Sequence, residues 1–313
     1  MKNYALIGSG GYISSRHLQA IKNTGGNLIV SFDIKEPSQN IEDLFPNSIF
    51  FNNFNEFKKH IADIKGSSKE IDFICICSPN HLHFEHITYG LKNNMNVICE
   101  KPLVLKPDHL NELDDLEKIS GNRVFSILQL RLHPAIINLK DSIRNKANKD
   151  IYKVDLSYFS SRDSSYLKSW KGSNDKSGGI VTNIGIHYFD LLGYLFGKIK
   201  KNIVHHRKED CATGYLEFNN AKVSWIISIN LQHMPKNLSK EQKTYRSIRI
   251  NDQEIDFSIV GNDLHEESYK NIIRKSGFGI AEARPSIELV NDIRNNKIIP
   301  SVGSKHRYYG NIE

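Results

Sequence analysis

The chain has 313 residues, of which 39% are hydrophobic and 25% charged, and its formal net charge is +7. This length allows two domains, and the composition is that of an ordinary globular protein. No apolar run reaches the ~18 residues of a membrane span, so we expect no membrane partner. Lysines and arginines are scattered rather than gathered into a basic arm, which favours a small anionic substrate over nucleic acid.

The cysteines and the N-terminus point to a reducing compartment. The first residues enter a strand directly and leave no room for a signal peptide, so we expect a cytoplasmic location. Cys75, Cys77 and Cys99 lie in apolar runs, and Cys211 precedes another. The C-x-C spacing of Cys75 and Cys77 occurs in metal sites, but no second cysteine pair lies nearby to complete one. Free buried cysteines are the simpler interpretation, and we expect no metal.

The N-terminal pattern predicts a dinucleotide-binding unit. A strand (3–7), a glycine turn (8–13), a helix (14–22) and a second strand (27–32) follow in order. Gly8 makes the tight turn, Gly10 lets the backbone approach a pyrophosphate, and the helix offers free N–H groups. Asp33, after the second strand, can bond both ribose hydroxyls and would repel a 2′-phosphate, which favours NAD over NADP. Ile13 occupies the third glycine position, so a glycine-rich turn without a ligand remains the alternative.

The alternation of strands and helices continues to about residue 130. Further strands are expected at 71–77, 96–99 and 123–128, with helices at 84–93 and 107–120. The pattern predicts an N-terminal Rossmann domain, residues 1–130, with a doubly wound parallel sheet. Polar residues then follow several strands at one sheet edge, where such folds bind ligands: Asp33, 78–83, Glu100, Lys101, Gln129 and Arg131.

Lys101 is the strongest catalytic candidate in this half. It follows a buried strand and precedes Pro102, which stiffens the chain. An amine beside a cationic ring such as oxidised nicotinamide loses its proton more easily, and so becomes an acid–base catalyst. The alternative is a surface lysine before a loop proline.

Residues 131–313 predict a second, α+β domain with an open, mostly antiparallel sheet. Strand-like runs occur at 152–160, 212–218, 222–230 and 245–250, with hairpin turns at 219–220 and 251–252. Such a sheet can leave one face available for another subunit.

One apolar helix, 180–196, carries three polar residues at i, i+4 and i+7: Asn183, His187 and Asp190. An α-helix places this spacing on one face, where the groups point at water, at each other or at a ligand. We expect His187 to be catalytic and Asp190 to orient it. The alternative is a core histidine bonded to Asp190.

Together these motifs resemble the Gfo/Idh/MocA oxidoreductases over nearly the whole chain. The residues that carry the resemblance are Gly8-x-Gly10 with Arg16-His17, Ser78-Pro79-Asn80-x-x-His83, Glu100-Lys101-Pro102 and Gly178-Gly179 with Asn183, His187 and Asp190. Segments 10–13, 98–103, 127–131, 166–172 and 182–185 are similar to the bacterial UDP-N-acetylglucosaminuronic acid 3-dehydrogenases. Asn183 replaces the aspartate usual in the wider family, and no counterpart aligns from about Ser301 onward.

The resemblance implies an NAD-dependent enzyme that oxidises the sugar C3 hydroxyl to a ketone, for lipopolysaccharide O-antigen synthesis. It implies a homotetramer packed through the open sheets, and in some members 2-oxoglutarate reoxidises the bound NADH. Lys101 or His187 would remove the hydroxyl proton, and Asp190 would hold His187. The expected cofactor-binding residues are Gly8, Gly10, Gly11, Tyr12, Ile13, Asp33, Ser78, Asn80, His83, Glu100, Lys101, Gln129 and Trp170. The expected substrate-binding residues are Lys101, Arg131, Arg162, Tyr166, Lys168, Asn183 and His187.

Three alternatives stay open at this point. Another member of the family could act on a free sugar or polyol, and a non-catalytic NAD-dependent sensor could share the fold. The basic charge alone suggests a nucleic-acid binder, which strongly salt-dependent DNA binding would reveal.

Overall fold

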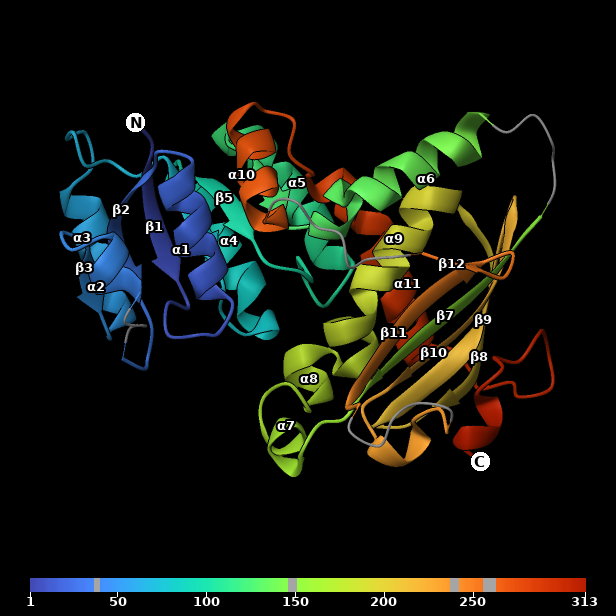
Figure 1. Cartoon of the computed structure of the whole chain (residues 1–313). Helices are drawn as coiled ribbons and strands as arrows, with labels where there is room; N and C mark the ends of the chain where they lie inside the picture. The colour runs from blue at the N-terminus through green and yellow to red at the C-terminus, as the bar shows by residue number, and fades with distance from the viewer. Residues whose placement is uncertain (37–39, 146–150, 237–241, 256–262) are drawn as a thin grey trace. The chain divides into compact units, whose positions relative to one another are not determined.

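The computed structural model describes residues 1–36, 40–145, 151–236, 242–255 and 263–313 (Figure 1). The chain divides into two compact units. The first unit comprises Met1–Leu132 and Gly261–Arg284, and the second comprises His133–Val260 and Pro285–Glu313. Among the described residues, no helix combines the length and the hydropathy needed to cross a membrane.

The first unit is built on a six-stranded parallel sheet of order β3-β2-β1-β4-β5-β6. The strands are β1 (Asn3–Ile7), β2 (Asn27–Phe32), β3 (Ile49–Phe51), β4 (Phe73–Ile76), β5 (Asn96–Cys99) and β6 (Val124–Ser126). This is the strand order of a Rossmann fold, and the order reverses between β1 and β4. The predicted doubly wound sheet is therefore confirmed, although sequence patterning missed the three-residue β3.

The helices of the first unit are α1 (Ser14–Asn23), α2 (Asn40–Leu44), α3 (Phe54–Asp63), α4 (His83–Lys92), α5 (Asp108–Ser120) and α10 (Leu264–Ile273). Helix α1 buries Leu18 and Ile21, which lie three apart on one face. Its preceding turn needs Gly8, whose φ is +87° and whose added Cβ would lie 2.5 Å from the carbonyl carbon of Cys77. No other residue fits that close approach between β1 and the end of β4.

The predicted domain boundary differs from the structure in one respect. Residues 261–284 belong to the first unit, whereas the sequence places everything after residue 130 in the second. The reason is helix α10, which packs against α1 and buries Tyr269 and Ile272 in the core of the first unit. The ring centroid of Tyr269 lies 6.1 Å from that of Tyr4 in β1.

The second unit holds a six-stranded sheet of order β12-β11-β7-β10-β9-β8. Its strands are β7 (Tyr152–Ser160), β8 (Ile199–Arg207), β9 (Cys211–Phe218), β10 (Ala221–Ser228), β11 (Thr244–Ile250) and β12 (Gln253–Glu254). Only β7 and β10 pair in parallel, so the predicted mostly antiparallel sheet is confirmed. The predicted hairpin turns also hold, and Asn251 and Asp252 adopt positive φ as a tight turn requires.

Helix α9 (Ile186–Phe196) packs on one face of the second sheet. The other helices of this part of the chain are α6 (Pro134–Asn145), α7 (Ser164–Lys168), α8 (Asn174–Ser177) and α11 (Ile280–Asn295), of which α11 begins in the first unit. In α9, Phe189 meets Trp225 of β10 edge-on, with ring centroids 5.1 Å apart. Tyr188 lies against Tyr158 of β7 at 5.6 Å. These contacts bury α9 and fix its orientation on the sheet.

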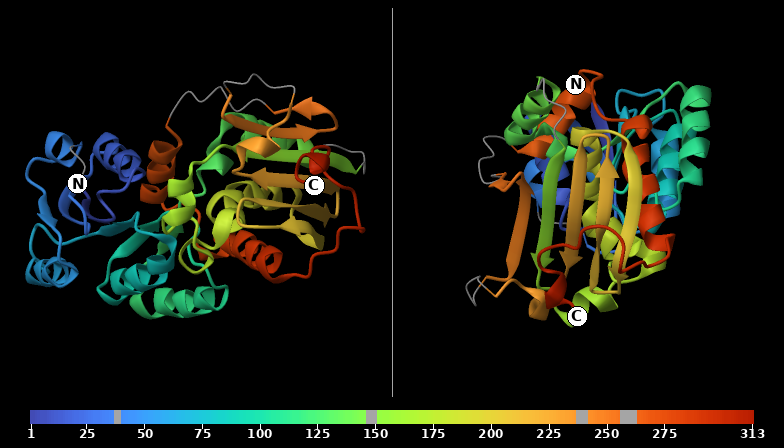
Figure 2. Two further views of the ribbon diagram at one scale, coloured as in Figure 1. Left: turned by 90° about the horizontal axis from the view of Figure 1, so that it is seen from below. Right: turned by 90° about the vertical axis from the view of Figure 1, so that its right-hand side faces the viewer.

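The C-terminal residues lie on the opposite face of this sheet. In the right panel of Figure 2 the red segment crosses in front of the strands. Arg307 donates two hydrogen bonds to Asp155 of β7, and His306 Nε2 lies 3.1 Å from the same carboxylate. Tyr308 packs edge-on against Phe159. The chain's own end therefore covers part of the face that the open-sheet pattern assigned to another subunit.

Candidate functional site

The carboxyl edge of the first sheet carries the predicted cofactor residues. Because all six strands run parallel, the segments after β1, β2, β4, β5 and β6 leave the same edge. The structure thus brings the glycine turn, Asp33, the 78–83 segment, Lys101 and Gln129 to one edge. Lys101 is partly exposed, and a cis peptide bond joins it to Pro102.

Asp33 holds the glycine turn in place. Its Oδ2 accepts a 2.8 Å hydrogen bond from the Gly10 N–H, and its Oδ1 accepts one of 2.9 Å from the Lys35 N–H. An added Cβ at Gly10 would lie 2.9 Å from the carbonyl oxygen of Glu36. Each carboxylate oxygen can accept a second hydrogen bond, which leaves acceptor capacity for ribose hydroxyls.

The first turn of helix α1 carries no acidic side chain that would compete with a bound anion. No side chain caps its N-terminus. Ile13, in the third glycine position, has a helical φ of −75°, so the departure from the glycine pattern causes no backbone strain. Tyr12 beside it is 88% exposed. The positive end of the helix dipole suits a pyrophosphate.

His83 ties the segment after β4 to the segment after β5. The ring is fully buried, with Nδ1 2.7 Å from the carbonyl oxygen of Pro102 and Nε2 2.8 Å from that of Ser78. Burial lowers the pKa of His83, against the opposing effect of the two carbonyls. Ser78 Oγ in turn lies 2.9 Å from His86 Nδ1, and burial lowers the pKa of His86 to about 4. A neutral His86 therefore accepts the hydroxyl proton of Ser78, while Asn80 is buried beside them in the chain.

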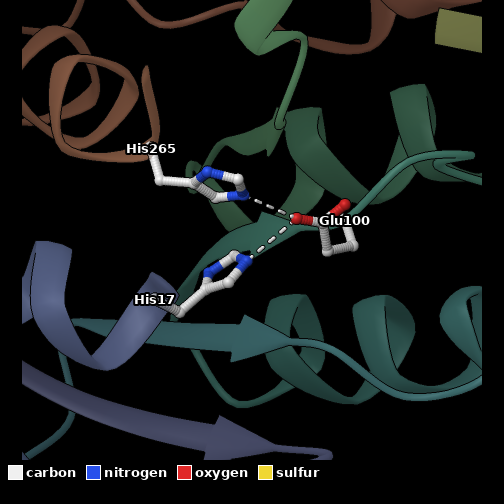
Figure 3. Close-up of side chains that lie close together, drawn as sticks. All are labelled: His17, Glu100 and His265. Atoms are coloured by element: carbon white, nitrogen blue, oxygen red, sulfur yellow. Dashed lines mark hydrogen bonds and ion pairs between the residues drawn. The ribbon is translucent and has the colours of Figure 1, made fainter. Parts of the chain in front are cut away.

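Glu100 lies in a buried cluster with His17 of α1 and His265 of α10 (Figure 3). Its Oε1 is 3.1 Å from His17 Nε2 and 3.2 Å from His265 Nε2. Burial favours the protonated acid, but the hydrogen bonds from the two histidines hold the pKa of Glu100 well below its usual range. Burial also lowers the pKa of His17. An ionised Glu100 that accepts a hydrogen bond from a neutral His17 is consistent with both pKa directions.

This cluster is the one group of potential metal ligands that the structure shows within its described ranges. No sequence pattern predicts it, because His265 lies 165 residues from Glu100. The Nε2–Oε1 separations are hydrogen-bond distances, and both second ring nitrogens face further partners, Tyr269 Oη and Asp263 Oδ1. Arg16-His17 is part of the family motif, but the motif alone assigns no role to His17.

Gln129 and Arg131 differ in their surroundings. Gln129 Oε1 is buried and has no hydrogen-bond partner among the described residues. A buried acceptor without a donor costs stability unless a ligand supplies one. Arg131 is buried, donates a 2.8 Å hydrogen bond to the carbonyl oxygen of Glu282, and stacks 5.1 Å from the Phe278 ring centroid. These two contacts lie within the first unit.

In the second unit the candidate residues centre on the start of α9. A π-helical turn, Val181–Gly185, precedes α9, so the α-helical spacing expected between Asn183 and His187 is wrong at this turn. His187 and Asp190 share regular α-helix, where residues three apart are neighbours. Asp190 is buried, and His187 is partly exposed. π-turns inside helices are frequent at functional sites.

Asn183 joins two other predicted substrate residues. Its Nδ2 donates a 2.9 Å hydrogen bond to Tyr166 Oη, and the Arg162 guanidinium lies 5.9 Å from the Tyr166 ring centroid. Burial raises the pKa of Tyr166, so the phenol stays neutral. Lys168 is exposed at the end of α7, and Trp170 follows in a turn with Lys171 Nζ 5.9 Å from its ring centroid.

Two family descriptions match this sequence. "Oxidoreductase family, NAD-binding Rossmann fold" matches residues 2–127, and "Oxidoreductase family, C-terminal alpha/beta domain" matches residues 140–304. The chain belongs to the Gfo/Idh/MocA oxidoreductase family. The family, the fold class and NAD as cofactor are thereby confirmed. The open acceptor capacity of Asp33, the uncapped α1 and the unpartnered Gln129 Oε1 fit a dinucleotide at the sheet edge.

Solved structures of this family resemble the chain over its whole length. The WlbA (WbpB) dehydrogenase of Thermus thermophilus, in complex with NAD and UDP-GlcNAcA, is 38% identical with a TM-score of 0.93. That alignment covers 98% of this chain and 100% of the other. The WlbA dehydrogenase of Bordetella pertussis, in complex with NADH and UDP-GlcNAcA, shares the fold at 20% identity, with a TM-score of 0.78 and coverages of 97% and 98%.

Curated relatives match more distantly. Glucose-6-phosphate 3-dehydrogenase of Bacillus subtilis is 27% identical over 205 residues, which are 63% of this chain and 54% of that protein. D-glucoside 3-dehydrogenase of Escherichia coli is 23% identical over 178 residues, 50% of this chain and 51% of that protein. The match spans about half the length of these two relatives.

Proposed function

We propose that this protein catalyses the NAD-dependent oxidation of the C3 hydroxyl of UDP-N-acetylglucosaminuronic acid to a ketone. The observation that carries the proposal is the full-length similarity, at 38% identity, to a dehydrogenase crystallised with NAD and UDP-GlcNAcA. The curated sugar 3-dehydrogenases support oxidation at C3. We propose further that the enzyme is a cytoplasmic homotetramer that serves lipopolysaccharide O-antigen synthesis.

The first unit would bind the cofactor. Asp33 would accept hydrogen bonds from the ribose hydroxyls while it holds Gly10, and Gly11 and the start of α1 would face the pyrophosphate. Ser78, Asn80 and Gln129 would contact the rest of the molecule from the same sheet edge, with His83 fixing the loops. When bound, NAD supplies the acceptor for the hydride that leaves C3.

The proton of the C3 hydroxyl needs a base from the protein. We propose Lys101 or His187 for this role, with the other residue orienting the same oxygen. Asp190, three residues after His187 in α9, would hold the imidazole. A positioned base typically contributes ~10²–10⁴-fold to the rate. A non-catalytic sensor would have no use for these three ionisable groups, because it transfers no proton.

Polyanion recognition would come from donors of the second unit. Arg162, Tyr166 and Asn183 already form one contact group, and Lys168 lies exposed two residues beyond Tyr166. Guanidinium, ammonium, phenol and amide donors suit a sugar carboxylate and a diphosphate. Arg131 is a further candidate, and its contacts to Glu282 and Phe278 hold its side chain within the first unit.

Two further points are how NADH is reoxidised and which class of sugar is the substrate. A second structure of the Thermus thermophilus dehydrogenase holds NAD and alpha-ketoglutarate, which supports reoxidation of NADH by 2-oxoglutarate. The competing substrate class is a free or singly phosphorylated sugar, as the name of the Bacillus subtilis relative indicates.

The test is mass spectrometry of the purified protein incubated with UDP-N-acetylglucosaminuronic acid and 2-oxoglutarate. The proposal predicts a keto sugar nucleotide and an equal amount of 2-hydroxyglutarate. Glucose-6-phosphate serves as the competing substrate, and Lys101→Ala serves as the control protein. Turnover of glucose-6-phosphate alone would move the assignment to the other substrate class.

A further inference from the structure

The cluster of His17, Glu100 and His265 joins three elements of the first unit that are distant in sequence. His17 comes from α1, Glu100 from the residue after β5, and His265 from the first turn of α10. The two rings meet edge-on, with centroids 5.4 Å apart, and both Nε2 atoms point at the same carboxylate oxygen (Figure 3). All three side chains are buried, and His17 is completely inaccessible.

The second carboxylate oxygen points along the chain to Lys101. Glu100 Oε2 accepts a 3.2 Å hydrogen bond from the main-chain N–H of Lys101. One carboxylate therefore accepts from two imidazoles and from the backbone of the next residue. Because two helices hold Oε1, the position of Oε2 and of the Lys101 backbone is coupled to α1 and α10.

The second ring nitrogen of each histidine also lies close to a polar partner. His17 Nδ1 lies 2.8 Å from Tyr269 Oη, which also contacts Cys75 Sγ of β4 at 3.1 Å. His265 Nδ1 lies 3.6 Å from Asp263 Oδ1. Asp263 caps the N-terminus of α10, and its Oδ2 accepts a 2.6 Å hydrogen bond from Arg16 of α1. The cluster is thus a continuous network from the sheet to both helices.

We propose that His17, Glu100 and His265 are positioning residues, which fix the backbone of Lys101 at the sheet edge by geometry rather than by charge. The catalytic consequence rests on the proposed role of Lys101, whereas the structural tether does not. A misplacement of a catalytic group by about 1 Å can cost ~10²-fold in rate. The returning segment 261–284 then contributes to the site through Glu100 without touching substrate.

The substitution Glu100→Gln separates geometry from charge. The glutamine can turn its carbonyl oxygen to the Lys101 N–H and donate both amide hydrogens to the two Nε2 atoms. Each ring would then accept at Nε2 and donate from Nδ1, His17 to Tyr269 Oη and His265 to Asp263. The network survives without the negative charge. Glu100→Ala removes every bond, and His265→Phe removes one donor from a less buried position.

The primary readout is amide hydrogen exchange of the peptide that contains Lys101, which needs no substrate. We expect faster exchange in Glu100→Ala, a smaller increase in His265→Phe, and near-wild-type exchange in Glu100→Gln. Glu117→Ala is the matched control, since Glu117 also accepts a main-chain N–H, that of Val124, elsewhere in the first unit. Its effect should stay local to residues around Val124.

The secondary readout is turnover with NAD at saturation. We expect kcat to fall about 10- to 100-fold in Glu100→Ala and to recover in Glu100→Gln. A His17→Gln/Glu100→Ala double variant should lose little more than Glu100→Ala alone, because the residues act through one network. If the wild type fails to oxidise the nucleotide sugar, the proposed function falls, and the exchange data still judge the tether.

Three results would overturn the proposal. Unchanged Lys101 exchange in a folded Glu100→Ala variant would show that the carboxylate holds nothing there. Equal losses in Glu100→Gln and Glu100→Ala would assign the effect to charge. One equivalent of zinc, retained after dialysis and lost in His265→Phe, would make the cluster a metal site instead.

Discussion

The Gly10 N–H donates a 2.8 Å hydrogen bond to the carboxylate of Asp33, which joins the glycine turn after β1 to the end of β2. The contact requires a close backbone approach, since a Cβ at Gly10 would lie 2.9 Å from the Glu36 carbonyl oxygen and 3.3 Å from Asp33 Cγ. The carboxylate that we propose as the ribose ligand also shapes the turn that we propose for the pyrophosphate. We therefore expect cofactor affinity to depend on both residues together.

Gly10→Ala should weaken NAD binding by about 10-fold or more, because the new methyl group displaces Asp33 or the 36 carbonyl and breaks a hydrogen bond to a charged group. Isothermal titration calorimetry measures the change. Gly193→Ala is the control: this glycine lies inside α9 with no atom within 4 Å of an added Cβ. That variant should keep its NAD affinity and gain about 0.5–1 kcal/mol in free energy of unfolding. Equal NAD affinity in both variants would contradict the close approach.

Lys101→Ala should fold, bind NAD and lose ~10²–10⁴-fold in turnover, because it removes a candidate base without touching the buried core. Steady-state kinetics with saturating cofactor gives kcat. Lys92→Ala, at the exposed C-terminal end of α4, is the control and should behave as wild type. Turnover near the wild-type rate in Lys101→Ala would leave His187 as the remaining base.

Acid should destabilise the first unit partly through His86. Burial lowers its folded-state pKa from 6.5 to about 4, so the unfolded chain binds a proton that the folded protein refuses. The stabilisation is complete above about pH 6.5 and is lost as the pH falls towards 4. In His86→Asn, the dependence of unfolding free energy on pH in this window should be shallower by up to about 1.4 kcal/mol per pH unit. Urea unfolding across the window measures it, and an unchanged slope would count against a buried neutral ring.

Attachment of the C-terminal segment should depend on Asp155. Burial favours the protonated acid, but hydrogen bonds from His306 and Arg307 outweigh it and lower the pKa of Asp155. The stabilisation is present above the unfolded-state value of about 3.8 and disappears as the pH falls through the folded-state pKa. Asp155→Asn should therefore speed proteolysis of residues 301–313 at neutral pH. Equal cleavage rates in wild type and variant at neutral pH would show that the ion pairs do not hold the segment.

Local patterns in the sequence predicted much of the fold. Strands β1, β2 and β7 have the predicted bounds, because they are rich in apolar and aromatic residues and lie between turn signals. Strands β3 and β8 were not predicted, because β3 has only three residues and β8 has exposed lysines in its first half. The π-turn before α9 has no periodic signature, so the sequence pattern predicts a regular α-helical spacing for Asn183.

The candidate site was predictable where a polar residue comes shortly after the end of a strand. Asp33, Lys101 and Gln129 follow β2, β5 and β6, and parallel topology brings such positions to one edge. The His17–Glu100–His265 network was not predictable, because periodicity reports which face a residue occupies and not which distant helix meets it. Residue 265 joins the first unit only because the chain returns to it.

The most direct test of the proposed reaction is a single turnover with UDP-N-acetylglucosaminuronic acid deuterated at C3 and enzyme-bound NAD. Mass spectrometry of the released cofactor reports where the hydride came from. The account predicts reduced cofactor that carries the deuterium, together with the 3-keto sugar nucleotide. Reduced cofactor without deuterium, or an unreacted nucleotide sugar with a fully NAD-loaded enzyme, would contradict it.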